Sequence, residues 1–509
     1  MKFKNRNLFR FISIYLIAFI SKVLFLISHL PFSQDQVRDV TFIRNLIDTG
    51  NWYIPLGPST SMGTFSLPPL YYYFHLFAQK IFFKQFYSMD LFVILIESFT
   101  PILIFLLTNK ITKNKFHSYA AALIYTFSYT VLSSSNAWNP NLVPFFSTLF
   151  ILGFVTFIFE KKANWLLASL VSFTVLVNLH FQWFLLAPLF GYLIILATYN
   201  YKKYWKQILL FLITSLILVS PYLYGELSNG FSNSKSALQI ISSDEVVFER
   251  VRKPAYITVF FSNYYQRILF GNLFTPHWGK QYDVFQPSII IGSILFNIFL
   301  LYVIFISVKK FKNKDRKLPL YISILIFLMI FLRVYKGDKP DYYLLVFISF
   351  FPVLFSNAVI SVFKNKSIFV QLIPYIVILL FQAVAIFVTP ISNSYMDMKS
   401  ITDQIIQISK NNKIIVEPTN QELVTPLSYF LNNEQMNLND KNDTDYYVLI
   451  CYTDQNCKGF RPNSNNKFNV YNYDHVTPQN FSYTWPGYDP TYQKIMFKGY
   501  LTALFFKVR

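Results

Sequence analysis

Long apolar runs, separated by short clusters of lysine and arginine, dominate the chain from residue 11 to residue 388. Many of these runs approach the roughly 20 residues that an α-helix needs to cross a bilayer. Counted by length and flanking charge, they predict about eleven transmembrane helices. The first is expected at about 11–30, the third at 119–132 and the last at 368–388. The predicted fold class is therefore an all-α polytopic membrane protein.

A short amphipathic helix is predicted after the first apolar run. Ser33 followed three residues later by Gln36 is a capping-box pattern, which marks a helix start. At helical spacing, Asp35, Arg38 and Asp39 share one face. The other face is apolar: Val37, Val40, Ile43 and Ile47. This pattern is typical of a helix on a membrane surface, with an acid–base–acid cluster in its first turn. Acids that merely complement the helix dipole are the alternative.

The basic clusters predict how the chain crosses the membrane. The formal net charge is +20, with 45 Lys and Arg against 25 Asp and Glu. Under the eleven-span assignment every strongly basic short loop falls on one side, as the positive-inside rule predicts. In the plasma membrane the N-terminus is then cytoplasmic, and the loops 31–90 and 225–287 and the tail lie outside. Because the Lys and Arg lie between apolar runs and the mean hydropathy is +0.37, we do not expect nucleic-acid binding.

The chain changes character near residue 390. Residues 391–509 are polar and rich in Asn and Asp, whereas residues 1–390 form the expected transmembrane domain. We expect a small soluble extracytoplasmic C-terminal α/β domain. Its predicted elements are a helix at about 396–410 and strands at 413–416 and 446–450. Cys451 and Cys457 are close enough in sequence to form a disulfide, and two free thiols are the alternative.

Short motifs occur at the expected outer ends of the spans. In chain order they are Asp35-x-x-Arg38, Gly50-Asn51-Trp52, Pro68-Pro69-Leu70-Tyr71-Tyr72, Trp138-Asn139-Pro140-Asn141, Leu179-His180-Phe181-Gln182, and Ser220-Pro221-Tyr222-Leu223 with Glu226. In this combination they resemble the GT-C glycosyltransferases, in particular the bacterial relatives of protein O-mannosyltransferases and of the lipid A aminoarabinose transferase. The resemblance covers about residues 1–390 and implies the GT-C fold.

The resemblance implies inverting transfer of a sugar from a polyprenyl-phosphate-linked donor on the outer face. Asp35 matches the acid of the family's first loop, which acts as base or orients the acceptor hydroxyl, and Arg38 matches the family's arginine. Three positions depart from the family. Gln36 replaces a frequent second acid, and Asp39 stands where some branches have Tyr. Leu67 replaces a Lys, so a lysine contact to the donor phosphate is not carried over.

The chemistry of sugar transfer also explains why these residue types would be needed. Displacement of a polyprenyl phosphate needs a carboxylate that accepts the hydroxyl proton and cations that stabilise the leaving phosphate. Asp35 is the candidate base, and the planar fork of Arg38 suits orienting Asp35 or contacting phosphate. Asp39 completes the predicted catalytic set. Asp35 and Asp39 could bind a divalent cation, but two acids without a nearby His give a weak metal signal, so no metal ligand and no certain cofactor is assigned.

Further polar residues are candidates for substrate binding: Arg44, Tyr72, Asn139, His180, Gln182, Glu226, Arg250 and Arg252. Each also has a structural interpretation. Basic residues near headgroups often only anchor lipid, and tyrosines form interfacial belts. His180 could simply be packed, and Asn139 and Glu226 could shape loops or helix ends. Glu97 lies inside the second run, where an ionisable group is expensive; for it we favour a helix-packing hydrogen bond.

We therefore predict an integral-membrane hexosyl- or pentosyltransferase that works at the lipid bilayer. The sequence leaves its acceptor open: protein, lipid or glycan. A transporter or flippase for lipid-linked saccharides is the first alternative. It would need polar span interiors, where we note only Glu97 and Gln382. A non-catalytic assembly protein, with a purely structural charged cluster, is the second alternative.

Overall fold

The computed structural model divides the chain into two compact units. The first comprises Met1–Leu24 and Gly50–Thr389, and the second comprises Phe25–Thr49 and Pro390–Arg509. The structure describes residues 2–59, 65–180, 182–242, 254–271, 287–334, 341–388, 394–410, 414–418, 423–431, 446–452, 494–498 and 501–507. The second unit therefore joins a segment close to the N-terminus with the C-terminal tail.

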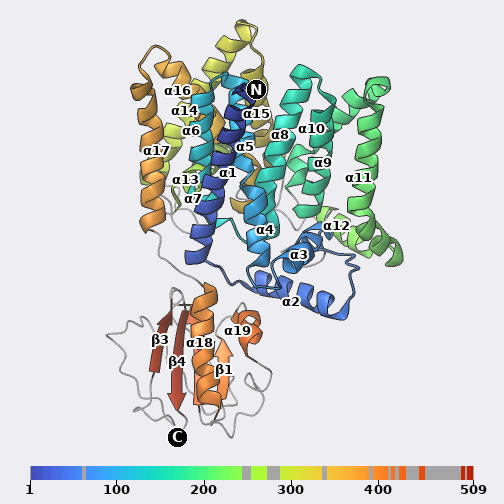
Figure 1. Cartoon of the computed structure of the whole chain (residues 1–509), viewed down its shortest axis with the longest axis vertical. Helices are drawn as coiled ribbons and strands as arrows, with labels where there is room; N and C mark the ends of the chain where they lie inside the picture. Colours follow the sequence, from blue (N-terminus) through green and yellow to red (C-terminus); the bar gives the residue numbers. More distant parts are fainter. Residues whose placement is uncertain are drawn as a thin grey trace. The chain divides into compact units, whose positions relative to one another are not determined.

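The first unit is a bundle of helices (Figure 1). Its elements are α1 (Lys2–Ser28, which continues into the second unit), α3 (Leu70–Ile81), α4 (Ser88–Glu97), α5 (Thr100–Thr112), α6 (Lys115–Thr126), α7 (Tyr129–Ser133), α8 (Val143–Glu160), α9 (Ala163–Leu179), α10 (Trp183–Tyr199), α11 (Tyr201–Ser228), α12 (Ser232–Ser242), α13 (Pro254–Phe270), α14 (Pro287–Lys312), α15 (Lys317–Val334), α16 (Phe350–Phe363) and α17 (Ile368–Val388), with the short 3₁₀ helices η1 (Asn139–Leu142) and η5 (Asp341–Phe347).

Within the described ranges, seven helical segments are long and apolar enough to cross a membrane. They are Leu8–Ser28, Ser88–Thr112, Asn139–Glu160, Tyr201–Ser228, Ile290–Lys312, Leu344–Phe363 and Ile368–Val388. Shorter apolar helices cover Ala163–Leu179, Trp183–Tyr199 and Lys317–Leu332. The prediction of a multi-pass membrane protein is confirmed. The third expected span, 119–132, is divided, because the extended backbone of Ser128 separates α6 from α7.

The expected loop 225–287 contains two helices, α12 and α13. From Phe261 to Phe270, α13 is buried on most sides, since only Gln266 and Phe270 in that stretch are partly exposed. Its large apolar side chains Phe261, Tyr264, Tyr265 and Ile268 follow i, i+3, i+4, i+7 spacing, which places them on one side of the helix. Tyr264 and Tyr265 donate hydrogen bonds to the carbonyls of Leu344 and Phe347, at 2.6 and 3.0 Å. α13 is thus part of the packed interior of the first unit.

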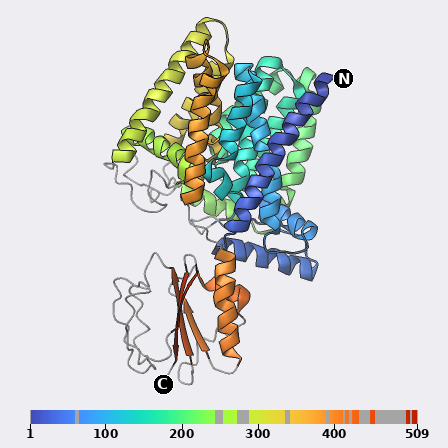
Figure 2. The same cartoon turned by 60° about the vertical axis from the view of Figure 1, so that its left-hand side comes forward.

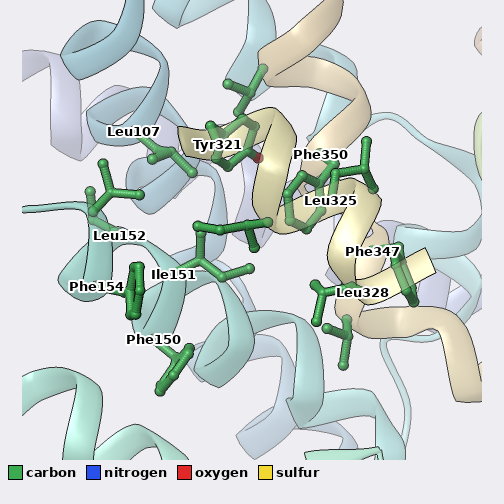
Figure 3. Packing of buried hydrophobic residues seen from close by; sticks show 14 of the residues in the cluster. Leu107, Phe150, Ile151, Leu152, Phe154, Tyr321, Leu325, Leu328, Phe347 and Phe350 are labelled. Carbon is green, nitrogen blue, oxygen red and sulfur yellow. The ribbon is translucent and has the colours of Figure 1, made fainter. Parts of the chain in front are cut away.

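The core of the first unit is formed by helices that are apolar on several faces. Figure 3 shows side chains of α5, α8, α15, η5 and α16 meeting in one cluster. Close approach of α8 to α9 depends on a glycine, since a Cβ at Gly153 would lie 2.2 Å from Oγ of Ser169. Small residues at such contacts let membrane helices pack tightly.

The second unit contains a four-stranded sheet, α2 (Gln34–Thr49), α18 (Ser394–Ser409) and α19 (Val424–Phe430). The strands are β1 (Ile414–Pro418), β2 (Tyr446–Tyr452), β3 (Lys494–Lys498) and β4 (Leu501–Lys507), in the order β1-β2-β4-β3. β1 and β2 are parallel and the other pairs are antiparallel. α18 packs along the sheet (Figure 2). β1, β2 and α18 lie where the sequence pattern predicts two strands and a helix.

Candidate functional site

The helix that carries the candidate base starts as the sequence predicts. The backbone N–H of Ser33 donates to Oε1 of Gln36 at 3.0 Å, and the N–H of Gln36 donates to Oγ of Ser33 at 3.4 Å. These reciprocal bonds are a capping box. The predicted apolar positions Val37, Val40 and Ile43 are buried. Asp35 therefore lies in the first turn of α2, where backbone N–H groups favour a negative charge.

Arg38 binds two acids near the start of α2, Asp35 and Asp39. Its Nη1 lies 2.8 Å from Oδ1 of Asp35, and its Nη2 lies 2.8 Å from Oδ1 of Asp39. Nε of Arg38 also donates to Oδ1 of Asp39 at 2.9 Å. The side chain of Asp39 is only 3% exposed, whereas that of Asp35 is 49% exposed. The buried carboxylate of Asp39 thus fixes the guanidinium of Arg38, and the carboxylate of Asp35 is accessible at the surface of the described structure.

A metal ion finds no ready set of ligands in the described chain. Nowhere in those residues do three His, Cys, Asp or Glu side chains gather as a metal site would require. Arg38 lies between Asp35 and Asp39 and already binds a carboxylate oxygen of each. The pair as described is therefore an ion-pair network built on one guanidinium.

Arg44, predicted to contact phosphate, has a protein partner within the second unit. Its Nη1 donates to the hydroxyl of Tyr429 on α19 at 2.6 Å. Its guanidinium carbon also lies 5.5 Å from the centre of the Tyr429 ring, within range of a cation–π contact. Arg44 therefore ties α2 to the C-terminal tail.

The first unit contains a cavity of about 390 Å³ around the Trp138–Asn141 motif, within the size range of ligand pockets. Its described lining comes from four parts of the chain: Tyr129, Thr130 and Ser133 of α7; Ser134, Asn136, Trp138 and Asn141; Tyr264, Arg267, Ile268 and Gly271 at α13; and Tyr342 and Leu345 of η5. Hydroxyl, amide and aromatic groups dominate this lining. Such groups suit a ligand rich in hydroxyls.

One charged residue, Arg267, belongs to the described lining of this cavity. It is 5% exposed. A buried guanidinium is stabilised best by an anion that accepts several of its N–H bonds. The sequence interpretation gave Arg267 no role, although it took Arg250 and Arg252 of the same expected loop, 225–287, as candidates. The signal was present, since one Arg interrupts the apolar stretch 254–270.

The walls of the cavity are fixed by bonds from outside its lining. Oδ1 of the buried Asp90 accepts the backbone N–H of Ala137 at 2.8 Å. This bond holds the turn that presents Trp138. The rings of Trp138 and Tyr342 meet with centroids 4.6 Å apart. The position of Trp138 is therefore fixed by the Asp90 bond next to it and by its contact with the Tyr342 ring.

The predicted residues Asn139, His180 and Gln182 lie behind this wall. Nδ2 of Asn139 donates to the carbonyl of Leu179 at 2.8 Å, and the side-chain amide of Gln182 donates to the carbonyl of Tyr342. The His180 ring lies 5.8 Å from the Tyr342 ring. Burial lowers the pKa of His180 to about 3, so its imidazole is neutral at physiological pH. The three support the cavity, and none is part of its described lining.

Two further predicted residues also serve the first unit's own structure. Tyr72 is buried on α3 with its ring 5.9 Å from that of Tyr71. Oε2 of Glu226 accepts the backbone N–H of Ser234 at 2.8 Å, near the start of α12. Glu226 therefore satisfies a helix-end donor, the structural role considered for it. The remaining candidates, Arg250 and Arg252, lie outside the described residues. So does Cys457, and with it the choice between a disulfide to Cys451 and two free thiols.

Glu97 makes the helix-packing bonds predicted for it. It accepts hydrogen bonds from the hydroxyls of Thr100 and Tyr125, at 3.1 and 3.2 Å, and from the N–H of Phe145 at 2.9 Å. Nζ of Lys22 on α1 lies 3.8 Å from its Oε2. This intramembrane lysine was not recognised from the sequence. Together they join α1, α5, α6 and α8 through one carboxylate.

The fold and the cavity define a multi-pass membrane protein with an interior pocket, whose described lining combines mostly apolar surface with hydroxyl and amide groups and one arginine. Residues 66–224 match the family model described as dolichyl-phosphate-mannose-protein mannosyltransferase. The matched range includes the α7–η1 wall of the cavity. This match supports the GT-C superfamily that the motifs resemble, and it supports a glycosyltransferase. A search of curated proteins finds no sequence match.

Solved structures similar to the chain have low sequence identity. ArnT from Cupriavidus metallidurans in the apo state is 12% identical, with a TM-score of 0.49 over 86% of this chain and 93% of that one. The same protein bound to undecaprenyl phosphate is 11% identical, with a TM-score of 0.49 over 97% of each chain. The oligosaccharyltransferase AglB from Archaeoglobus fulgidus, with an inhibitory peptide and a dolichol-phosphate, is 11% identical, with a TM-score of 0.46 over 86% of this chain and 69% of that one.

Proposed function

We propose that this protein transfers a sugar from a polyprenyl-phosphate-linked donor to a hydroxyl-bearing acceptor. The observation that carries the proposal is the cavity of the first unit, which combines buried Arg267 with hydroxyl, amide and aromatic groups. The donor named in the matched family, dolichyl-phosphate-mannose, is itself a sugar on a polyprenyl phosphate. A phosphate and a sugar joined in one ligand need this mixture of groups.

Arg267 takes the role of the cation that holds the donor phosphate. As the bond from the anomeric carbon to the phosphate oxygen breaks, negative charge accumulates on the phosphate. A guanidinium fixed beforehand in a cavity stabilises that charge without reorganising. The neighbouring hydroxyls and amides of the lining form hydrogen bonds with the sugar. The Trp138 and Tyr342 rings supply apolar surface beside it.

Asp35 takes the role of the general base. The acceptor oxygen attacks the anomeric carbon, its proton passes to the Asp35 carboxylate, and the polyprenyl phosphate leaves with the electron pair of the broken bond. A single displacement of this kind inverts the anomeric centre. Arg38 orients the carboxylate through the 2.8 Å contact, and Asp39 holds Arg38. General base catalysis of this kind is worth roughly 10²–10⁴-fold.

The direct test uses membranes supplied with a labelled polyprenyl-phosphate sugar. Asp35→Asn keeps the shape of the side chain but cannot accept the proton, so transfer should fall by roughly 10²-fold or more. Asp48→Asn, an exposed acid on the same helix, is the matched control and should transfer like the wild type. Equal transfer by Asp35→Asn and the wild type would contradict the proposed base.

The donor site has a test of its own. Purified Arg267→Gln should bind labelled polyprenyl phosphate roughly 10- to 100-fold more weakly, because a charge-assisted hydrogen-bond pair is lost. Arg267→Lys keeps the charge without the planar fork, so its affinity for polyprenyl phosphate should lie between that of the wild type and that of Arg267→Gln. Arg316→Gln, at an exposed arginine, is the control. Unchanged affinity in a folded Arg267→Gln protein would remove Arg267 from the donor site.

We further propose that the protein lies in the plasma membrane with its N-terminus in the cytoplasm and α2 on the outer side. The positive-inside distribution supports this orientation. In a chain whose Cys451 and Cys457 are replaced by Ser, Thr49→Cys should react with an impermeant maleimide on intact cells. Lys314→Cys should react only after permeabilisation. The reverse labelling pattern would contradict the orientation.

A further inference from the structure

The segment that carries the candidate base is built into the C-terminal unit. Phe25–Thr49 and Pro390–Arg509 form one compact unit. α2 packs against α19 within it. The backbone N–H of Tyr395 also donates to the carbonyl of Leu30, at 3.4 Å, just before α2 begins. The tail therefore contacts α2 and the residues that lead into it.

The first attachment is an aromatic cluster at the start of α2. Phe32 is buried and directly precedes the capping residue Ser33. Its ring lies 5.3 Å from Tyr395, 5.6 Å from Tyr429 and 5.2 Å from Phe430. Aromatic pairs at these separations are attractive beyond the area they bury. Three rings of the tail thus fix the residue from which the helix starts.

The second attachment is the hydrogen bond from Arg44 to Tyr429 at 2.6 Å. Ser33 and Arg44 are eleven residues apart, or about 16 Å along a helix axis. One attachment would let the helix pivot, whereas two at this separation fix both its direction and its rotation about its axis. Tyr429 takes part in both, since its ring touches Phe32 and its hydroxyl accepts from Arg44.

Asp35 lies on the opposite side of α2 from Arg44. The two are nine residues apart, or two and a half turns, so their side chains leave the helix about 180° apart. This agrees with the exposure of Asp35, whose side chain is 49% accessible. The tail therefore holds one side of the helix, and the Asp35 side chain on the other side stays about half exposed. A rotation of about 10° would displace that carboxylate by about 1 Å, and misplacement on this scale can cost up to 10²-fold in rate.

We propose that the C-terminal unit positions Asp35, with Arg44 and Tyr429 as positioning residues that set the rotation of α2. This inference rests on the proposed function, because it assumes that Asp35 acts in the reaction. It assigns the tail a part in catalysis through α2. Under this proposal the tail affects the rate of transfer to every acceptor, because it positions the base.

The test compares Tyr429→Phe, Arg44→Gln and the double variant in the full-length protein. Tyr429→Phe keeps the ring and removes the hydroxyl that accepts from Arg44, so the aromatic cluster stays filled. Two readouts are taken: kcat and donor KM with a labelled polyprenyl-phosphate sugar, and amide hydrogen exchange of residues 37–44. Ser428→Ala, at the exposed neighbour of Tyr429 on α19, is the matched control.

Each single variant should lower kcat roughly ten- to hundredfold, the range of a lost hydrogen bond to a charged group. Donor KM should stay unchanged, because the proposed donor residue Arg267 is untouched. Exchange in α2 should be faster in both variants, and the double variant should be no worse than either single one. A wild-type kcat together with wild-type exchange in both variants would overturn the inference, as would additive losses.

Failure of the inference can be told apart from failure of the proposed function. If Asp35→Asn abolishes transfer while Tyr429→Phe behaves like the wild type, the base stands and the positioning role falls. If Asp35→Asn transfers normally, the proposed base falls and takes the catalytic part of the inference with it. The exchange measurement then still decides whether Arg44 and Tyr429 hold α2.

Discussion

Nη1 of Arg38 lies 2.8 Å from Oδ1 of Asp35, one helical turn away on α2. The same guanidinium binds Asp39, whose side chain is almost fully buried. Arg38 is therefore the shared partner of half-exposed Asp35 and buried Asp39. Substitutions at Arg38 and Asp39 can separate an effect on catalysis, through Asp35, from an effect on stability, through Asp39.

Arg38→Gln should impair both transfer and stability. Asp39 would keep a buried charge without this partner, which should cost about 1–3 kcal/mol of unfolding free energy. Adding Asp39→Asn should restore most of the thermal stability but not the transfer rate, because Asp35 would still lack its orienting group. Thermal unfolding in detergent and labelled-donor transfer check this. Recovery of full transfer in the double variant would contradict a role for Arg38 beside Asp35.

The stability of the first unit should fall in acid because of His180. Its pKa is about 3 in the fold against an ordinary value near 6.5, so the unfolded chain takes up a proton first. The contribution is complete above about pH 6.5 and is lost progressively as the pH falls toward 3. Near pH 5 the loss should be about 2 kcal/mol. Thermal unfolding at pH 7 and pH 5 measures it. His180→Gln should lose less stability over that interval, and an unchanged pH dependence would contradict the burial argument.

Gly271→Ala should disturb the cavity wall. Gly271 has φ +56°, and a Cβ there would lie 2.7 Å from Cγ of Tyr129. The variant should lose about 1 kcal/mol of stability from the backbone alone. Because Tyr129 lines the cavity and must move, binding of labelled polyprenyl phosphate should weaken severalfold.

The matched control for that variant is Gly191→Ala on α10. A Cβ at Gly191 meets nothing within 4 Å, and its backbone is helical. This variant should be neutral or more stable by about 0.5–1 kcal/mol, with unchanged donor binding. If both alanine variants bound donor equally, the Tyr129 wall would have no part in the site.

Glu97→Gln should be strongly destabilising in detergent. The change leaves the buried Lys22 ammonium without its carboxylate at 3.8 Å, and removing one partner of a buried pair costs about 3–5 kcal/mol. The double variant Lys22→Met with Glu97→Gln should regain most of that loss, because Gln can still accept from Thr100 and Tyr125. Thermal unfolding of the three proteins tests the pair. A double variant no more stable than Glu97→Gln would contradict the charge argument.

Local patterns allowed the sequence to predict the helical elements and the start of α2. Apolar runs are long enough to be read without knowing their neighbours. The capping box joins Ser33 to Gln36, three residues apart, so its signal is complete within one turn. The same holds for Asp35, Arg38 and Asp39, which the helical repeat alone places on one face. Helical periodicity was also present at α13, but the interpretation of 225–287 as a loop concealed it.

Only the tertiary structure brought together residues that are distant in sequence. The cavity combines Trp138 with Arg267 and Tyr342, and the Lys22–Glu97 pair joins helices that no short pattern relates. The attachment of α2 to the tail depends on a bond between Arg44 and Tyr429, which are 385 residues apart. Such contacts depend on how helix faces pack, and a side chain's own neighbours in the chain carry no information about that partner. The sequence thus determined which segments are helices, and packing decided which of their polar groups meet.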